Sequence, residues 1–139
     1  MECLSIYLIT VAVAWAIASL VKVIIYFIKK KRISKKPVFS TGGMPSAHTA
    51  PVVALTTIIA FVDGINSVVF AISLMFSIVV MTDAIFVRRA VGEQGEAIKK
   101  LLPKDVKQPY FARGHKPLEV LIGGLIGVIV GIATFLIIQ

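Results

Sequence analysis

The sequence predicts an all-α integral membrane protein, folded as a bundle of four transmembrane helices with two basic cytoplasmic loops. Of its 139 residues 58% are apolar, and the mean hydropathy is +0.93. A soluble domain of this length would leave about a third of its surface in water and would expose much of this apolar material. Charge is sparse and one-sided, with 15 Lys and Arg against 7 Asp and Glu. These observations favour a single membrane domain over residues 1–139.

Four apolar stretches give the predicted spans, because each is close to the ~20 residues that a helix needs to cross hydrocarbon. They cover approximately residues 4–28, 47–62, 68–87 and 118–138. The first is too long for a signal peptide and ends in the basic run 29–32, so we expect it to remain in the protein. Only DGINS (63–67) separates the second and third spans, which predicts an antiparallel helical hairpin.

Basic residues gather at one end of these spans. Six lie in 29–36, eight in 88–116, and the remaining one is Lys22 near the end of the first span. By the positive-inside rule this end faces the cytoplasm and both termini lie outside. We expect the charge to attract membrane lipids and anionic lipid phosphates, and no nucleic acid. Within the second basic segment, EQGEAIKKLL (93–102) predicts a short amphipathic helix at the membrane surface.

The segment TGGMPSAH (41–48) has the residues of an anion site at the start of the second span. Glycine lets the backbone approach a ligand, and Pro45 fits the first turn of a helix. The N–H groups at a helix start attract anions, and Gly43, Ser46 and His48 lie beside them. An ordinary loop-to-helix junction is the alternative, in which Ser46 caps the helix and His48 only forms a hydrogen bond.

A second segment, RGHKPLE (113–119), places the other histidine before the fourth span. Glu119 follows His115 by four residues, so its carboxylate can accept the Nδ1 proton and orient the ring. Alternatively, Glu119 complements the helix dipole and His115 is solvated. The chain has 2 histidines, and the topology puts both on one face. Two imidazoles beside anion sites suit a transfer in which one ring attacks phosphorus and the other protonates the leaving oxygen.

Asp83 is a charge that the third span carries inside hydrocarbon, near its cytoplasmic end. A carboxylate there is costly and marks a candidate functional site. Its partner is expected to be Lys22 or one of the arginines Arg88 and Arg89. The alternatives are that Lys22 extends its amine to the interface and that the two arginines form a solvated basic end.

Together these pieces resemble the divergent bacterial and plant branch of the type 2 phosphatidic acid phosphatase superfamily, which is related to the acid phosphatases and vanadium haloperoxidases. The matching pieces extend from the first span to the last: Lys22, STGGMPSAH (40–48), DA (83–84) with VRR (87–89) and GEQ (92–94), and GHKPLEV (114–120). The resemblance implies a phosphohistidine intermediate on His115, protonation of the leaving group by His48, and orientation of His115 by Glu119. It implies no metal and no cofactor.

The resemblance also implies basic residues around the phosphate. Where the parent pattern has an arginine six residues before the nucleophile, this chain has Pro109, so Arg89 is expected to take that role, with Arg113 as the alternative. Four spans enclose such a site less completely than the parent's usual six, and a homodimer is one way to close it. The full predicted set of phosphate-binding residues is Lys22, Gly43, Ser46, Arg88, Arg89 and Arg113, supported by Asp83.

The sequence therefore predicts a metal-independent lipid phosphatase in the bacterial cytoplasmic membrane, with its active site on the cytoplasmic face. The expected substrate is a lipid phosphate monoester or pyrophosphate, with phosphatidylglycerophosphate first and phosphatidic acid or polyprenyl phosphates next. Two other functions are compatible with the sequence. One is a small oligomeric proton-coupled transporter that uses Asp83, and the other is a scaffold that binds anionic lipids without catalysis.

Overall fold

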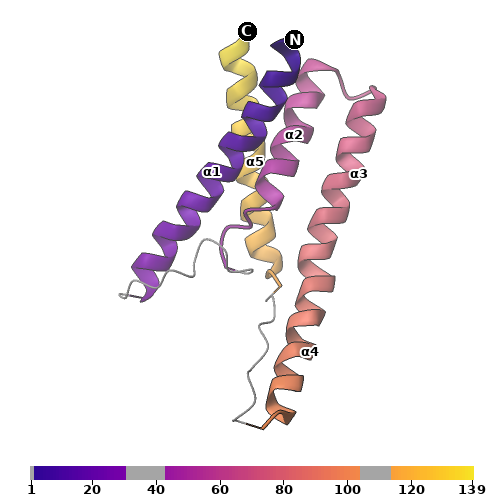
Figure 1. The fold of residues 1–139 in the computed structure, drawn as a ribbon. Helices are drawn as coiled ribbons and strands as arrows, with labels where there is room; N and C mark the ends of the chain where they lie inside the picture. The colour runs from indigo at the N-terminus through magenta and orange to yellow at the C-terminus, as the bar shows by residue number, and fades with distance from the viewer. Residues whose placement is uncertain (1, 31–42, 104–113) are drawn as a thin grey trace.

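The computed structural model describes residues 2–30, 43–103 and 114–139, and all regular structure within these ranges is helical. This agrees with the predicted all-α class. α1 begins and α5 ends at the same end of the bundle, and α4 lies at the opposite end (Figure 1). Arg113 and most of the basic run 29–36 lie outside the described residues. The elements are α1 (Glu2–Lys30), α2 (Thr49–Val62), α3 (Val68–Thr82), the π-helical turn η1 (Asp83–Val87), α4 (Arg88–Leu101) and α5 (Pro117–Ile138).

Three helices in the described residues are long and apolar enough to cross a membrane, and α2 is a shorter apolar helix. The three are Ile6–Ile28, Val68–Leu101 and Pro117–Ile138. α2 has 14 residues, which rise about 21 Å, whereas hydrocarbon is about 30 Å thick. Helix length therefore supports three of the four predicted spans. The second is short because the glycine and proline before it occupy a non-helical segment, so the helix begins only at Thr49.

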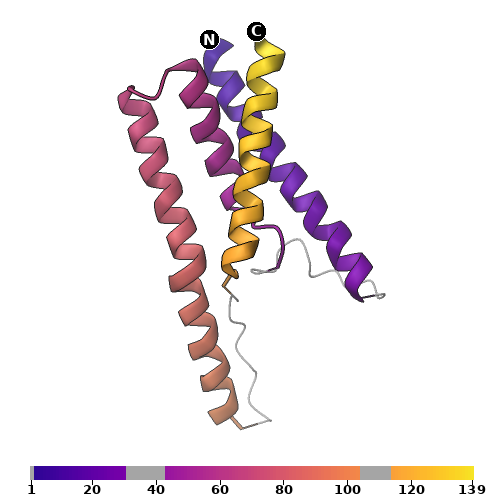
Figure 2. The same ribbon diagram turned by 180° about the vertical axis from the view of Figure 1, so that it is seen from behind.

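α2 is the central helix, since it packs against α1, α3 and α5, most extensively against α5. Figure 2, seen from behind, shows α3 on one side of α2 and the crossed pair α1 and α5 on the other. α3 and α5 therefore meet the same helix from different sides. Because α3 and α5 both pack on α2, their positions relative to the non-helical segment 43–48, which precedes α2, are set by this one helix.

Glycines on α5 allow its close approach to α2. Gly123, Gly127 and Gly131 recur every four residues, and this spacing favours close packing, either within the core or between subunits. A Cβ at any of these three positions would lie 2.5 to 2.7 Å from an atom of the opposing segment, which no side chain can do without displacing it. The stripe is therefore part of the core. Its contacts are Gly123 with Ser46, Gly127 with Ala50, and Gly131 with Thr57.

Hydroxyl groups join α2 to α3. The Oγ1 of Thr56 lies 2.7 Å from the Oγ of Ser73 and 2.8 Å from the Oγ of Ser77. Ser77 also donates to the carbonyl oxygen of Val52 at 3.0 Å. Ser73 and Ser77 are the buried residues of α3, whose other side chains are apolar except for Thr82 and lie more in the open. Because hydrocarbon gives apolar helices no hydrophobic reason to associate, these hydroxyl contacts supply the attraction.

The predicted turn between the second and third spans is present. Ser67 caps α3, with its Oγ accepting from the N–H of Phe70 at 3.1 Å. At the same end of the bundle, the hydroxyl of Tyr7 donates to Asp63 Oδ2 at 2.6 Å. This contact ties α1 to the α2–α3 turn.

The helix predicted within 93–102 is present, although it is not an element of its own. It belongs to α4, which continues α3 through η1 as a single helix of 34 residues (Val68–Leu101). Figure 1 shows α4 extending past the ends of α1 and α5. The reason is that no proline interrupts the chain between Val68 and Leu102, so the helix has nothing to stop it until Pro103.

The glycine stripe makes a prediction about stability. Gly127→Ala places a methyl group against the backbone of α2, and such overpacking costs about 1–3 kcal/mol. Gly124→Ala is the matched control, because a Cβ there meets nothing within 4 Å and alanine favours the helix by about 0.5–1 kcal/mol. We expect the Gly127 variant to melt at a lower temperature and the Gly124 variant to melt at or above the wild-type value. Thermal unfolding in detergent measures this, and equal melting temperatures for the two variants would contradict the close seam.

Candidate functional site

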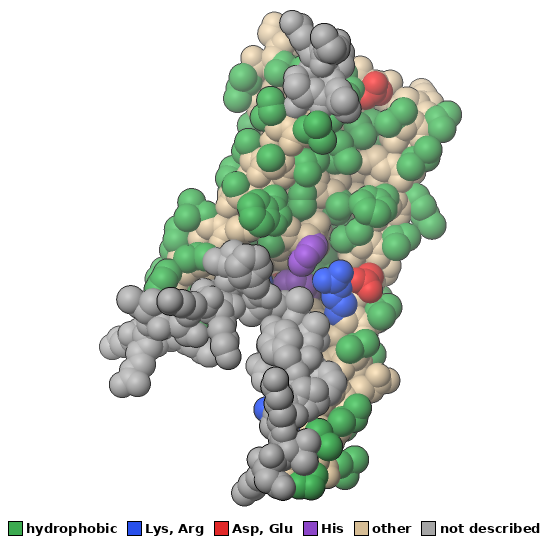
Figure 3. Space-filling model, viewed as in Figure 1, with side chains coloured by type: hydrophobic (Ala, Val, Ile, Leu, Met, Phe, Trp, Pro, Cys, Tyr) green, Lys and Arg blue, Asp and Glu red, His purple; other side chains and the backbone are tan. Residues whose placement is uncertain are grey.

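Charged side chains of α1, η1, α4 and α5 lie near the two histidines, at the end of the bundle where α2 and α5 begin. Figure 3 shows the histidine side chains beside basic and acidic side chains, with a wall of hydrophobic side chains above them. Electrostatic interactions join both histidines to Lys22 of α1 and to Arg88 of α4. The sequence-predicted residues Lys22, His48, Arg88 and His115 therefore belong to one site.

Glu119 orients the ring of His115. Its Oε2 lies 3.0 Å from His115 Nδ1 and also accepts from the backbone N–H of Lys116 at 3.2 Å. A carboxylate can only accept hydrogen bonds, so Nδ1 carries the proton and Nε2 keeps its lone pair. His115 is only 3% exposed. The alternative in which His115 is solvated is therefore wrong, because its side chain is buried.

Burial keeps the two imidazoles neutral near pH 7. For His115, burial lowers the pKa and the hydrogen bond to Glu119 opposes this, with a net lowering from 6.5. His48 is exposed on one side, but the burial of the rest of its ring is still the first cause of its lowered pKa, and the charge of Arg88 is the next. Desolvation and nearby cations both disfavour imidazolium. A neutral His115 with its Nδ1 bonded to Glu119 keeps the lone pair of Nε2 unprotonated.

The segment before α2 presents two of its three predicted residues to the site. Gly43 is exposed, with φ of +91°, a backbone conformation that favours glycine. A Cβ there would lie 3.7 Å from Lys22 Cε. His48 is exposed just before α2. This segment therefore brings an exposed glycine backbone and an imidazole to the amine of α1.

Ser46, in contrast, is 0% exposed and binds protein. Its Oγ accepts from the Oγ1 of Thr49 at 2.8 Å and from the backbone N–H of Thr49 at 3.3 Å. Its own N–H donates to the carbonyl oxygen of Glu119 at 3.0 Å. The Ser46 hydroxyl thus accepts from the first N–H of α2, as in the capping alternative, although the N-cap residue itself is His48. The Ser46 N–H fastens the start of α2 to α5.

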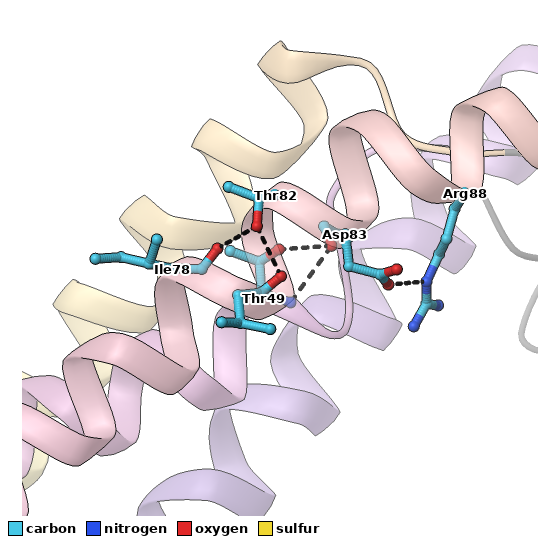
Figure 4. Close-up of polar contacts among 7 residues, drawn as sticks. Thr49, Ile78, Thr82, Asp83 and Arg88 are labelled. Atoms are coloured by element: carbon cyan, nitrogen blue, oxygen red, sulfur yellow. Dashed lines mark hydrogen bonds and ion pairs between the residues drawn. The ribbon is translucent and has the colours of Figure 1, made fainter.

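The two adjacent arginines have different surroundings. Arg88 donates from Nε to Asp83 Oδ2 at 2.6 Å (Figure 4) and acts electrostatically on both histidines. Arg89 pairs with Glu93 at 2.9 Å, and its side chain is 58% exposed. Arg89 also lines a hollow of about 360 Å³ that borders His115. The arginine that shares the electrostatic environment of both rings is therefore Arg88, whereas Arg89 was the one preferred from the sequence.

Comparison with known proteins gives two matches. The model of a family described as "Divergent PAP2 family" matches residues 5–130. An uncharacterized membrane protein, YuiD, of Bacillus subtilis (strain 168) is 38% identical over 130 residues, a match that covers 81% of this chain and 82% of that protein. No solved structure matches the chain.

The lowered histidine pKa values predict how stability depends on pH. Both values fall below the 6.5 of an unperturbed histidine, so between the folded value and 6.5 the unfolded chain binds more protons. The free energy of unfolding therefore falls as the pH drops below about 6.5. We expect the melting temperature to decrease between pH 7.5 and 5.5, and to decrease less in a His48→Asn/His115→Asn double variant. Equal losses in the two proteins would show that the rings do not contribute.

Proposed function

This chain belongs to the divergent PAP2 family, and we propose that it is a metal-independent lipid phosphatase of the membrane that works through a phosphohistidine. The observation that carries the proposal is the His115–Glu119 pair at 3.0 Å, with His48 and two basic side chains in its electrostatic environment. A buried imidazole held by a carboxylate is the arrangement of an activated nitrogen nucleophile. The cations beside it suit the charge of a phosphoryl group.

In the first step the lone pair of His115 Nε2 attacks phosphorus, and the bond from phosphorus to the ester oxygen breaks. His48, protonated when the phosphate dianion is bound, gives its proton to the leaving alkoxide. Binding of the dianion favours this protonation because it opposes the effect of Arg88 and Lys22 on the His48 pKa. The products of this step are an alcohol and a phosphoryl group on His115.

In the second step water attacks the phosphoryl group and the P–N bond breaks. His48, now neutral, takes a proton from the attacking water, and the electron pair returns to His115 Nε2. Inorganic phosphate leaves, and both rings regain their starting state. Throughout, Glu119 keeps the Nδ1 proton of His115 in place and stabilises the positive charge that develops on the ring.

Lys22 and Arg88 bind the phosphoryl oxygens in this proposal, together with the backbone near Gly43. Lys22 is 9% exposed, and its Cε lies close to Gly43. Ser46 acts through the fold, since its hydroxyl holds Thr49. Arg89 contributes at the hollow that borders His115. A contribution from Arg113 stays a prediction.

Phosphatidylglycerophosphate is the first candidate substrate, followed by phosphatidic acid and polyprenyl phosphates or diphosphates. By the positive-inside rule, the end of the bundle that carries Lys22, Arg88 and the histidines faces the cytoplasm. A small anionic lipid phosphate in that leaflet matches a basic site on that face. We place the protein in a bacterial cytoplasmic membrane, where a homodimer is one way to enclose the site further.

Among the residues that the structure describes, no contact favours the proton-coupled transporter. That function needs a carboxylate that exchanges protons inside the membrane, whereas Asp83 accepts a hydrogen bond from Arg88 at 2.6 Å. A scaffold that binds lipid phosphates without turnover would use the same cations, and it differs from the enzyme in releasing no phosphate.

The first test is phosphate release from a panel of lipid phosphates in detergent with EDTA. We expect the wild type to release inorganic phosphate, His115→Ala to release none, and His48→Ala to be slower by about 100- to 10,000-fold. Both variants must keep the wild-type elution profile and melting behaviour. Absence of release from every lipid by a folded wild type would reject the phosphatase and leave the scaffold.

A second test compares the adjacent arginines through the same chemical change. Losing a charged donor to the transition state lowers kcat by about 100- to 1,000-fold. We expect Arg88→Ala to show a loss in this range, and Arg89→Ala to lose at least tenfold less. A larger loss for Arg89→Ala would return the phosphate contact to the arginine preferred from the sequence.

A further inference from the structure

The π-helical turn η1 leaves the backbone carbonyl of Ala84 able to accept a hydrogen bond from the segment that carries His115. In an α-helix each carbonyl oxygen accepts from the N–H four residues later. At η1 the N–H of Arg88 instead bonds to the carbonyl of Asp83, five residues earlier. The carbonyl oxygen of Ala84, which Arg88 would otherwise use, accepts from the N–H of His115 at 3.1 Å. The widened turn thus provides the acceptor that fixes the main chain of His115.

Gly114 lets this contact form. A Cβ at Gly114 would overlap the backbone nitrogen of Arg89 and would lie 2.7 Å from the carbonyl carbon of Arg88. No other residue type fits so close to the backbone of the neighbouring helix. The chain before His115 therefore lies directly on the junction between η1 and α4.

The same turn brings Asp83 and Arg88 together. Five residues advance about 140° beyond a full turn of an α-helix, so side chains at this spacing normally diverge. An i→i+5 turn places them on one side, and Arg88 Nε lies 2.6 Å from Asp83 Oδ2 (Figure 4). Both side chains are about one third exposed, at 35% and 34%. The contact occupies Nε, so the terminal Nη groups can be offered to a ligand.

We propose that η1 is the positioning element of the site and that Asp83 is its positioning residue. Asp83 holds the guanidinium of Arg88, while the Ala84 carbonyl holds the main chain of His115. Because both contacts arise from one turn, the arginine and the nucleophile keep a fixed relative position. Asp83 itself does not touch the substrate. The inference rests on the proposed phosphatase function.

This role predicts different effects on kcat and KM. In Asp83→Asn the charge of Arg88 remains and still attracts the phosphate, so KM changes little. The guanidinium is no longer fixed where charge develops in the transition state, so kcat falls by about 10- to 100-fold. A loss of global stability would instead reduce the amount of active protein and leave both constants of the folded fraction unchanged.

A double-mutant cycle separates positioning from a general effect on the fold. If Asp83 acts through Arg88, then Asp83→Asn should add less than about threefold to the loss caused by Arg88→Ala, since contacting residues are not additive. Asp63→Asn is the matched control. Asp63 also accepts a 2.6 Å hydrogen bond, from Tyr7, but at the other end of the bundle, and kcat should stay near the wild-type value.

The outcomes distinguish the two proposals. The positioning role is supported if the wild type releases phosphate, if Asp83→Asn lowers kcat, and if the same substitution has little further effect in the Arg88→Ala variant. Full kcat in Asp83→Asn, or losses that multiply in the double variant, would overturn it and leave the phosphatase standing. If the wild type releases no phosphate, both fail. If Asp83→Asn does not fold, Asp83→Glu replaces it, because it keeps the charge and moves the carboxylate by one methylene. We expect Asp83→Glu to show the same lowered kcat. A wild-type kcat in Asp83→Glu would refute the positioning role.

Discussion

The close seam between α2 and α5 is the contact on which the site depends. Because the glycines of α5 admit the backbone of α2, the start of α2 lies against the first turns of α5, and the Ser46 N–H reaches the Glu119 carbonyl at 3.0 Å. His48 precedes one helix and His115 precedes the other, so the seam brings the two histidines into one electrostatic environment. A wider separation would leave each imidazole at an isolated helix end.

Non-helical backbone near hydrocarbon must find partners within the protein, since no water is there to supply them. The segment 43–48 meets this need through Ser46, and the segment before α5 meets it through the bond from His115 to Ala84. The contacts that satisfy the backbone are therefore the same contacts that orient the site. This explains why α2 can be shorter than a full span: the residues before it form the non-helical segment 43–48 that borders the site.

The sequence was sufficient for features that depend on composition and local spacing. Apolar stretches predicted the helices, and the i, i+4 spacing predicted the contact between His115 and Glu119 that the structure has at 3.0 Å. It did not single out Arg88, the arginine that acts electrostatically on both histidines, over the adjacent Arg89. Adjacent residues on a helix differ by about 100° in direction, so the choice depends on the phase of the helix. The π-turn changes that phase, and no residue pattern in DAIFV (83–87) signals it. The role of the Ala84 carbonyl was missed for the same reason.

In the proposed reaction, the positive charges of Lys22 and Arg88 match the negative charge of a bound phosphate dianion. Lys22 and Arg88 lower the pKa of both histidines, on top of the larger effect of burial, so both rings are uncharged while the site is empty. A phosphate dianion between these cations cancels their effect on the imidazoles. In the proposed reaction His115 stays neutral because it is only 3% exposed and burial is the largest effect on its pKa, whereas the more exposed His48 gains the proton. In the proposed mechanism, substrate binding itself assigns the acid role to His48 and the nucleophile role to His115.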